Sequence, residues 1–249
     1  MSLNRFKDKN ILITGAAVGI GKATAYLLAR QGAKLVLIDL DVEKLKLLVD
    51  ELRGSDHIYY KCDLSNIDGI ETIILSIQKE GIVFDGLVHC VGIRSRRPLK
   101  LLTSNHIEQV MRINYGSFIE LVRLTTKRNR FNKNYSIIAI SSISSKVGGA
   151  GVTAYSASKA AIEAAVRSLS KELYKKGIRI NTVVPGQVNT PAYAELMKLS
   201  GNDSDPVLDR QFLGLAEPID VANLISFLLS TDSKQITGAS MPVDGGFLV

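Results

Sequence analysis

The chain has 249 residues, of which 46% are hydrophobic, enough for one large core or at most two small ones. Its formal net charge of +7 is spread along the chain, except for the basic stretches RSRR at 94–97 and KRNR at 127–130, which no aromatic residues interleave. This pattern argues against nucleic-acid binding as the main role. No apolar run approaches the roughly 20 residues of a membrane-spanning helix, so no membrane association is expected.

The N-terminal segment and the cysteines bear on location. MSLNRFKDKN lacks the apolar middle of a secretory signal, so export is not expected. Cys62 and Cys90 have no metal-ligand spacing and form no disulfide framework in the sequence. We therefore expect no metal site and a reducing, cytoplasmic location.

Short apolar runs alternate with longer amphipathic stretches from the N-terminus onward. The runs are continuously apolar, as in strands buried on both faces, and predict strands at 10–14, 34–39, 57–62, 86–91, 136–141 and 178–184. The amphipathic stretches predict helices within 19–32, 41–54, 66–81 and 154–177, each of which closes on a glycine that suits a left-handed cap. This alternation predicts a single α/β domain over 1–249 with a mainly parallel sheet.

The segment 186–216 does not continue the alternation of apolar runs and amphipathic stretches. It is polar and punctuated by proline and glycine, and its pattern predicts two short helical pieces. Long segments of this kind inside compact domains are often functional lids. We expect a substrate lid at about 186–216.

A glycine-rich loop, TGAAVGIG, follows the first predicted strand and leads into a helix. Gly15, Gly19 and Gly21 would let a phosphate approach the backbone, and the helix N-terminus would face it with unpaired N–H groups. Asp39 ends the second strand, where a carboxylate can bind the ribose hydroxyls of a dinucleotide. Its alternative role, capping the next helix, can be filled by Asp41.

The helix at 154–177 carries Tyr155 and Lys159 one turn apart, about 6 Å along its axis. A free phenol, with a pKa of about 10, is a poor base at neutral pH. A nearby ammonium lowers that pKa, so the pair suits removal of a proton from an alcohol while a hydride leaves its carbon. A partly exposed surface pair is the alternative interpretation.

Five motifs together carry a resemblance to a known family. TGAAVGIG, the SS that ends at Ser142, YSASK at 155–159, PGQVNT at 185–190 and MPVDGG at 241–246 stand in the order and spacing of the short-chain dehydrogenase/reductase family. The resemblance covers essentially the whole chain. It implies a doubly wound Rossmann fold, with a seven-stranded parallel sheet flanked by helices, and nicotinamide-dependent interconversion of alcohols and carbonyls.

The resemblance also implies four catalytic residues. Tyr155 would be the acid–base, and Lys159 would lower its pKa and hydrogen-bond the nicotinamide ribose. Ser142 would hold the substrate oxygen, and Asn114 would anchor a proton-relaying water. Ser142 as an ordinary strand-end serine and Asn114 as a helix-kink residue are the structural alternatives.

The implied cofactor contacts extend beyond the glycine loop. They are Gly15, Gly19, Ile20, Gly21, Asp39, Asp63, Gly92, Tyr155, Lys159, Pro185, Gly186, Val188 and Thr190. Asp63 would meet the adenine, although it could simply cap its loop. The family's Asn-Asn-Ala-Gly motif is replaced by HCVG at 89–92, which keeps Gly92 and predicts a hydrogen-bonded structural role for His89.

Cofactor choice depends on Asp39, whose charge would repel the 2′-phosphate of NADP. Enzymes of the family that use NADP usually carry a basic residue in the glycine loop or just after the second strand, where this chain has Val18 and Leu40. Lys22 is basic but lies one residue inside the helix. We expect NAD, with NADP as the alternative.

The expected function is an NAD(P)-dependent oxidoreductase acting on a small secondary alcohol or ketone. A reductase of 3-oxoacyl thioesters on an acyl carrier protein is the alternative within enzymes, and a non-catalytic nucleotide-binding regulator is the alternative outside them. The arginines of RSRR suggest that the substrate carries a carboxylate or a phosphate. Their alternative role is a contact between subunits or with solvent. The apolar C-terminal end GGFLV predicts a homo-oligomer, and the resemblance to the family implies that it is a tetramer.

Overall fold

The computed structural model describes residues 4–200, 205 and 207–249. Within them, seven strands form one sheet in the order β3-β2-β1-β4-β5-β6-β7, and every neighbouring pair is parallel. The strands are β1 (Asn10–Thr14), β2 (Lys34–Asp39), β3 (Ile58–Lys61), β4 (Phe84–His89), β5 (Phe131–Ile140), β6 (Arg179–Pro185) and β7 (Ser240–Val243). The predicted single-domain, doubly wound Rossmann fold is confirmed.

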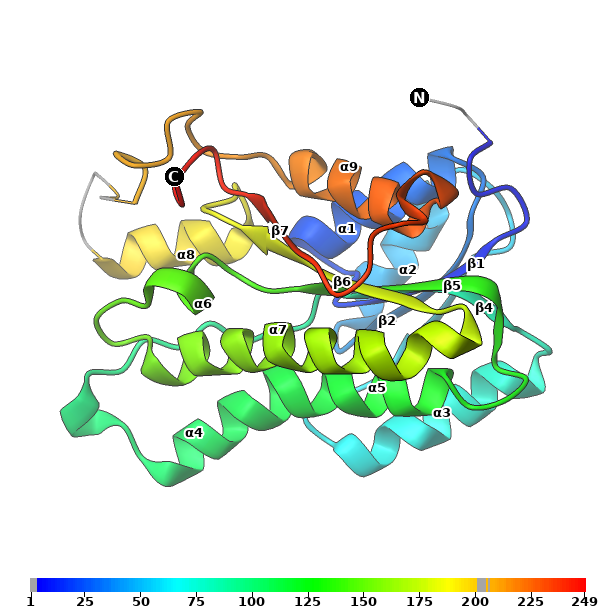
Figure 1. Cartoon of the computed structure of the whole chain (residues 1–249), viewed down its shortest axis with the longest axis horizontal. Coiled ribbons are helices and arrows are strands. Elements are labelled where there is room, and N and C mark those ends of the chain that lie inside the picture. Colours follow the sequence, from blue (N-terminus) through cyan, green and yellow to red (C-terminus); the bar gives the residue numbers. More distant parts are fainter. Residues whose placement is uncertain (1–3, 201–204, 206) are drawn as a thin grey trace.

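Helices cover both faces of the sheet (Figure 1). The α-helices are α1 (Gly19–Arg30), α2 (Val42–Glu51), α3 (Ile67–Lys79), α4 (Ser104–Met111), α5 (Ser117–Thr125), α6 (Ser144–Val147), α7 (Thr153–Leu173), α8 (Pro191–Ser200) and α9 (Pro218–Leu229). Helices α1, α2 and α9 pack on one face, and α3, α5 and α7 pack on the other. No helix among the described residues is both long and apolar enough to cross a membrane.

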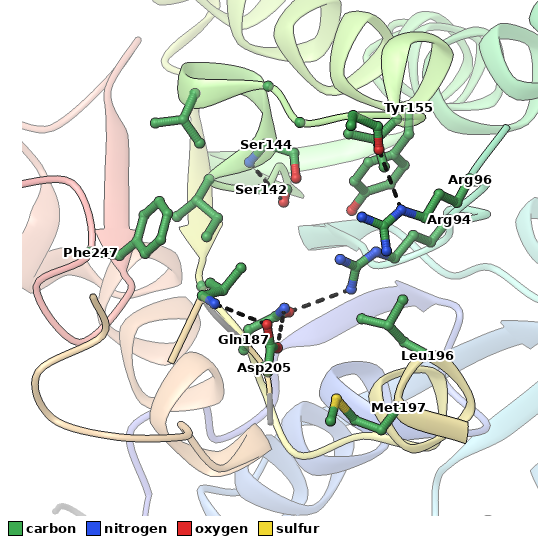
Figure 2. Close-up of a pocket in the computed structure, with 18 residues that line it drawn as sticks. Arg94, Arg96, Ser142, Ser144, Tyr155, Gln187, Leu196, Met197, Asp205 and Phe247 are labelled. Atoms are coloured by element: carbon green, nitrogen blue, oxygen red, sulfur yellow. Dashed lines mark hydrogen bonds between the residues drawn. The ribbon is translucent and has the colours of Figure 1, made fainter. Parts of the chain in front are cut away.

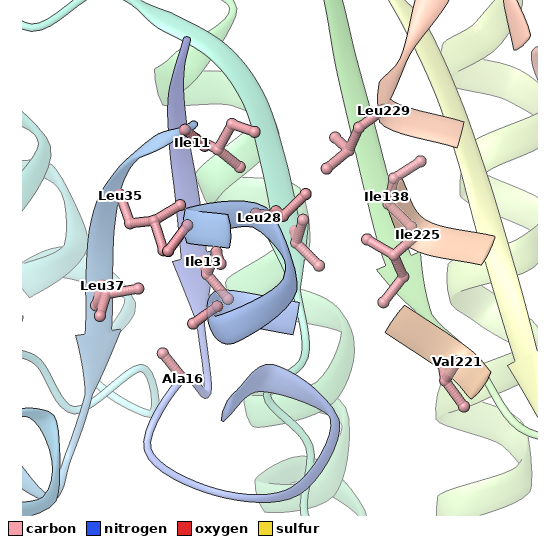
Figure 3. Packing of buried hydrophobic residues seen from close by; sticks show 14 of the residues in the cluster. Ile11, Ile13, Ala16, Leu28, Leu35, Leu37, Ile138, Val221, Ile225 and Leu229 are labelled. Carbon is pink, nitrogen blue, oxygen red and sulfur yellow. The ribbon is translucent and has the colours of Figure 1, made fainter. Parts of the chain in front are cut away.

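Alternate residues of the central strands supply the two cores. Ile11 and Ile13 of β1 face α1 and α9, as Figure 3 shows, whereas Leu12 between them belongs to the cluster on the opposite face. In β5, Ile138 likewise belongs to the core beside α1 and α9, and its neighbour Ile137 belongs to the core on the opposite face. A strand whose successive side chains point to opposite buried faces needs apolar residues throughout, which is why these runs do not alternate with polar residues.

Local sequence signals set the helix boundaries. Asp41 accepts a hydrogen bond from the backbone N–H of Lys44 at 3.1 Å and so caps α2. The predicted capping glycines follow their helices with positive φ, as at Gly32 (89°) and Gly177 (71°). These local predictions are confirmed because each depends only on neighbours within one turn.

Several strand bounds differ from the sequence prediction by one or two residues, and β4 spans Phe84–His89 instead of 86–91. Two differences are larger. Strand β5 begins at Phe131 instead of 136, because Phe131 pairs with Phe84 beyond a register shift in β4. The described residues of the segment 186–216 contain one helix, α8, and residues 207–210 form a turn, so a second helical piece is not found among them. Residues 201–204 and 206 of that segment lie outside the described part of the chain.

Candidate active site

The carboxyl ends of the central strands border two adjoining cavities. One of them lies where the chain order reverses between β1 and β4, the place where open parallel sheets bind ligands. The glycine-loop cavity, of about 380 Å³, extends from Asp39 past the glycine loop to Thr190. The Phe247 cavity, of about 350 Å³, extends from Ser142 to Phe247 (Figure 2). Both cavities are lined by Arg94, Ser142, Tyr155, Gly186 and Gln187.

The glycine loop leaves room for a ligand against bare backbone. No side chain caps α1 at Val18, so the first N–H groups of this helix face the glycine-loop cavity. A Cβ on Gly21 would lie 2.0 Å from the carbonyl oxygen of Gly15, so only glycine permits this close turn. The uncapped helix start and the absence of side chains there fit a pyrophosphate.

Asp39 lies at the end of β2 and lines the glycine-loop cavity. One carboxylate oxygen accepts from Ala17 N at 3.0 Å, and the other accepts from Leu40 N at 2.7 Å and from Asp41 N at 3.2 Å. The capping of α2 falls to Asp41, as predicted, but Asp39 also ties the glycine loop to β2. This second role was not expected from the sequence.

Tyr155 and Lys159 project from α7 toward the junction of the cavities. The ammonium of Lys159 lies 5.9 Å from the centre of the Tyr155 ring and donates to the carbonyl oxygen of Ile140 at 2.8 Å. Lys159 is only 3% exposed, and this burial lowers its pKa to about 8. A Cβ on Gly92 would lie 2.9 Å from Lys159 Nζ, so glycine is needed at Gly92 for the lysine to occupy this position.

Burial and neighbouring polar groups act in opposite directions on the pKa of the Tyr155 phenol. Burial raises the pKa of its phenol, and the hydrogen bond with Ser142 and the charge of Arg94 offset part of that rise. Ser142 and Arg94 thus both favour the phenolate. The ammonium of Lys159 donates to Ile140 O and lies 5.9 Å from the ring centre, and its expected lowering of the Tyr155 pKa stays a prediction.

Asn114 lies in a π-helical turn, Arg112–Gly116, between α4 and α5. Its fully buried amide accepts from Ile93 N at 2.8 Å and donates to Ile93 O at 3.1 Å and to Ser158 Oγ at 2.9 Å. Such π-turns often occur at functional sites because they redirect one side chain out of the helix. Asn114 thus joins the loop after β4, which carries Gly92, to the helix carrying Lys159, and its role as a water anchor stays a prediction.

His89 has the structural surroundings that the sequence suggested. Its ring is fully buried, with Nδ1 2.9 Å from Thr14 Oγ1 and Nε2 3.4 Å from Ser117 Oγ. Ser117 donates its own proton to Ile113 O, which fits a neutral ring that donates from Nε2 to Ser117 and accepts at Nδ1. Burial lowers the pKa of His89 to about 3. The ring therefore braces β1, β4 and α5 against one another.

The other predicted cofactor residues fall in two groups. The glycine-loop cavity is lined by Gly15, Gly19, Ile20, Gly21, Gly92, Pro185, Gly186, Val188 and Thr190. Asp63 is exposed and does not line that cavity, and its carboxylate accepts from Ser65 N at 2.8 Å. Hydrogen bonds from the Ser65 side chain and backbone hold the pKa of Asp63 below the usual range. Asp63 therefore caps its loop, and its contact with the adenine stays a prediction.

Glu163 is a buried residue that the sequence analysis missed. Its carboxylate accepts from the hydroxyls of Ser141 and Ser145 and from the ammonium of Lys146 at 2.5 Å. Burial raises the pKa of Glu163, but these hydrogen bonds outweigh it and hold the pKa below the usual range. Because Ser141 and Ser145 flank Ser142, Glu163 fixes the turn that presents Ser142. The only sequence signal for Glu163 was its position one helical turn after Lys159 on α7.

Comparison with known proteins agrees with this geometry. A family model described as enoyl-(acyl carrier protein) reductase matches residues 15–248. The 3-oxoacyl-[acyl-carrier-protein] reductase FabG of Thermotoga maritima is 33% identical, over 98% of this chain and 100% of that protein. The cyclopentanol dehydrogenase of Comamonas testosteroni is 29% identical, over 98% of this chain and 99% of its own. A crystal structure of a short-chain dehydrogenase/reductase from Brucella melitensis superposes with a TM-score of 0.91 at 30% identity, covering 99% of both chains.

The cavity beside the glycine loop, together with the tyrosine, lysine and serine that line it, has the features of a nicotinamide-dependent oxidoreductase. The chain belongs to the short-chain dehydrogenase/reductase family.

Proposed function

We propose that this enzyme interconverts a secondary alcohol and a ketone with NAD as its cofactor. The observation that carries the proposal is the convergence of Ser142, Tyr155 and Lys159 at the junction of the two cavities. A cofactor held in the glycine-loop cavity would have its reactive end next to a substrate held in the Phe247 cavity.

In this proposal each side chain has a distinct task. When bound, the reduced cofactor supplies a hydride to the carbonyl carbon and leaves in its oxidised form. Tyr155 gives the phenolic proton to the carbonyl oxygen, while the Ser142 hydroxyl donates to that oxygen where negative charge develops. The ammonium of Lys159 would stabilise the phenolate that remains and hydrogen-bond the nicotinamide ribose. A proton taken up from solvent then restores the phenol, so one ketone, one hydride and one proton yield one alcohol.

The residues of the glycine-loop cavity would hold the cofactor. The uncapped start of α1 suits the pyrophosphate, and the bare backbone of Gly92 lets the ring approach Lys159. Val188 would contact the carboxamide end through its backbone, and Thr190 through its hydroxyl. Asp63 keeps its proposed contact with the adenine, alongside its loop-capping role.

The direct test is a panel of ketones and secondary alcohols assayed with both nicotinamide cofactors by absorbance of the reduced ring. The panel includes a 3-oxoacyl thioester, because FabG is named for that reaction. Reduction of simple ketones supports the proposal. Turnover of the thioester alone would favour the acyl-carrier-protein alternative, and no turnover of any member would favour a non-catalytic role.

NAD is expected to exceed NADP in kcat/KM by about tenfold or more. The Asp39 carboxylate would face a 2′-phosphate at like charge, at a cost of about 1–4 kcal/mol, and 1.4 kcal/mol is one decade. Lys22 does not compensate, since its ammonium lies 3.8 Å from the Glu51 carboxylate and 5.6 Å from the centre of the Tyr26 ring.

Asp39→Asn is the sharper variant for this prediction, because an amide oxygen can still accept from Ala17 N while the charge is lost. We expect it to reduce the preference for NAD, as measured by kcat/KM with each cofactor. Equal efficiency of the wild-type enzyme with both cofactors would show that Asp39 does not control the choice.

We also propose that the enzyme is a homotetramer. We further propose a reducing, cytoplasmic location, which the free thiols of Cys62 and Cys90 support. The apolar C-terminus supports the tetramer less than the sequence suggested, because Phe247 packs on Ile143 and Val184 within its own subunit. Phe212 (71% exposed), Leu213 (87%) and Val249 (93%) are exposed apolar groups near that end that a neighbour could cover. Sedimentation at micromolar concentration should give a tetrameric mass, and a monomeric mass would contradict this proposal.

The lid proposed at 186–216 rests on its described residues. Leu196 and Met197 of α8, together with Asp205 and Val207, line the Phe247 cavity. Faster cleavage of this segment by protease without cofactor and substrate than with them would support a lid.

A further inference from the structure

The Phe247 cavity has two unlike walls. Arg94 and Arg96 bring two guanidinium groups to one side, and Phe247 lies across the cavity from them in Figure 2. The apolar side chains that line the cavity are Ile143, Val147, Val152, Leu196, Met197, Val207 and Phe247. A ligand that fills this space meets positive charge at one end and hydrocarbon along much of its length.

Arg96 is held in place by the loop opposite. Its Nε donates to Ala150 O at 3.3 Å, and the N–H of neighbouring Arg97 donates to Gly151 O at 2.7 Å. A Cβ on Gly151 would lie 3.1 Å from Arg96 Cγ, so the arginine stem packs directly on that backbone. Among the described residues, the terminal N–H groups of Arg96 have no hydrogen-bond partner, and they remain available to a ligand.

Arg94 borders both cavities and lies near the reacting end. Its NH1 group makes a long hydrogen bond of 3.4 Å to Gln187 Oε1, and its charge lowers the pKa of the Tyr155 phenol against the effect of burial. Neither Arg94 nor Arg96 forms an ion pair with a carboxylate in the described part of the chain. Two unpaired guanidinium groups lining one cavity are an anion-binding arrangement.

The carboxylate of Asp205 does not cancel this charge. It is the one carboxylate among the described residues that line the cavity. It already accepts from Gln187 Nε2 at 2.7 Å and from Val207 N at 3.0 Å, and it also interacts with the Tyr193 hydroxyl. With two guanidinium groups and one engaged carboxylate, the cavity keeps a net positive charge.

We propose that the substrate is an oxo acid or the corresponding hydroxy acid, a carboxylate with an apolar body. The inference rests on the proposed function and names the substrate class for the same site. Arg96 and Arg94 bind the carboxylate, since the planar guanidinium matches its two oxygens. The carbonyl group then lies at Ser142 and Tyr155, and the hydrocarbon packs against Leu196, Met197 and Phe247.

The test compares six-carbon 2-, 3- and 4-oxo acids with their methyl esters, using the whole enzyme and NADH. At the spacing that fits the site, the acid should exceed its ester in kcat/KM by about tenfold to a hundredfold, the range for a hydrogen bond to a charged group. Arg96→Gln should lower this acid-to-ester ratio about tenfold, mainly through a higher KM for the acid. Arg97→Gln is the matched control, because Arg97 is exposed and lines neither cavity.

The outcomes separate this inference from the proposed function. If acid and ester are reduced equally at all three spacings, the carboxylate assignment is overturned while the ketone reductase activity stands. If a ketone phosphate monoester is preferred over every acid, the anion is a phosphate and the assignment is wrong. If Arg97→Gln lowers the acid-to-ester ratio of kcat/KM as much as Arg96→Gln does, the carboxylate assignment is also overturned. Failure to reduce any ketone, ester or acid would overturn both.

Discussion

Tyr155→Phe should lower kcat by about 10²–10⁴-fold and leave NADH affinity within about twofold of wild type. The variant removes only the hydroxyl that gives the proton, and proton transfer by a positioned side chain contributes a rate factor of this size. The ring stays in place beside Lys159, whose ammonium lies 5.9 Å from its centre. Steady-state rates with a reducible ketone and NADH fluorescence titration give the two quantities.

Tyr174→Phe is the matched control, because Tyr174 is 58% exposed beyond the end of α7 and loses the same hydroxyl. It should keep full activity. Lys159→Ala should weaken both turnover and cofactor binding, since the proposed role of its ammonium includes the ribose. A Tyr155→Phe enzyme with a substantial fraction of wild-type activity would show that the acid–base assignment is wrong.

The free energy of unfolding should fall steeply as the pH is lowered from about 6.5 toward 3, because of His89. Burial holds the pKa of this ring at about 3 in the folded chain, against about 6.5 when unfolded. In that window only the unfolded state binds the proton, so stability is complete above the unfolded pKa and is lost on acidification. The slope from this one group is about 1.4 kcal/mol per pH unit.

His89→Asn removes this titration and should flatten the slope by that amount between pH 6.5 and 4. The variant also loses the ring that joins Thr14 to Ser117, so it is expected to be less stable than wild type at pH 8. Urea unfolding at a series of pH values measures both effects. An unchanged slope in the variant would mean that His89 is already protonated in the folded enzyme.

Much of the fold follows from local sequence. The runs at 10–14 and 34–39 became β1 and β2 with the predicted bounds, because strands buried on both faces must be apolar throughout. Tyr155 and Lys159 could be paired from spacing alone, since one helical turn brings such residues to one face. The predictions failed where distant partners intervene, as at β5, whose first residues depend on pairing with β4.

The sequence by itself determined the order of elements, the glycine loop and the identity of the residues that converge on the site. Only the tertiary structure decided how they act together. The Phe247 cavity brings together Arg94, Ser142, Gln187 and Phe247, which lie far apart along the chain. Burial also decided that the Tyr155 pKa is raised, and hydrogen bonding decided that Glu163 holds the turn of Ser142. The reason is physical: propensity and spacing act within a few residues, whereas desolvation and charge depend on everything that packs around a group.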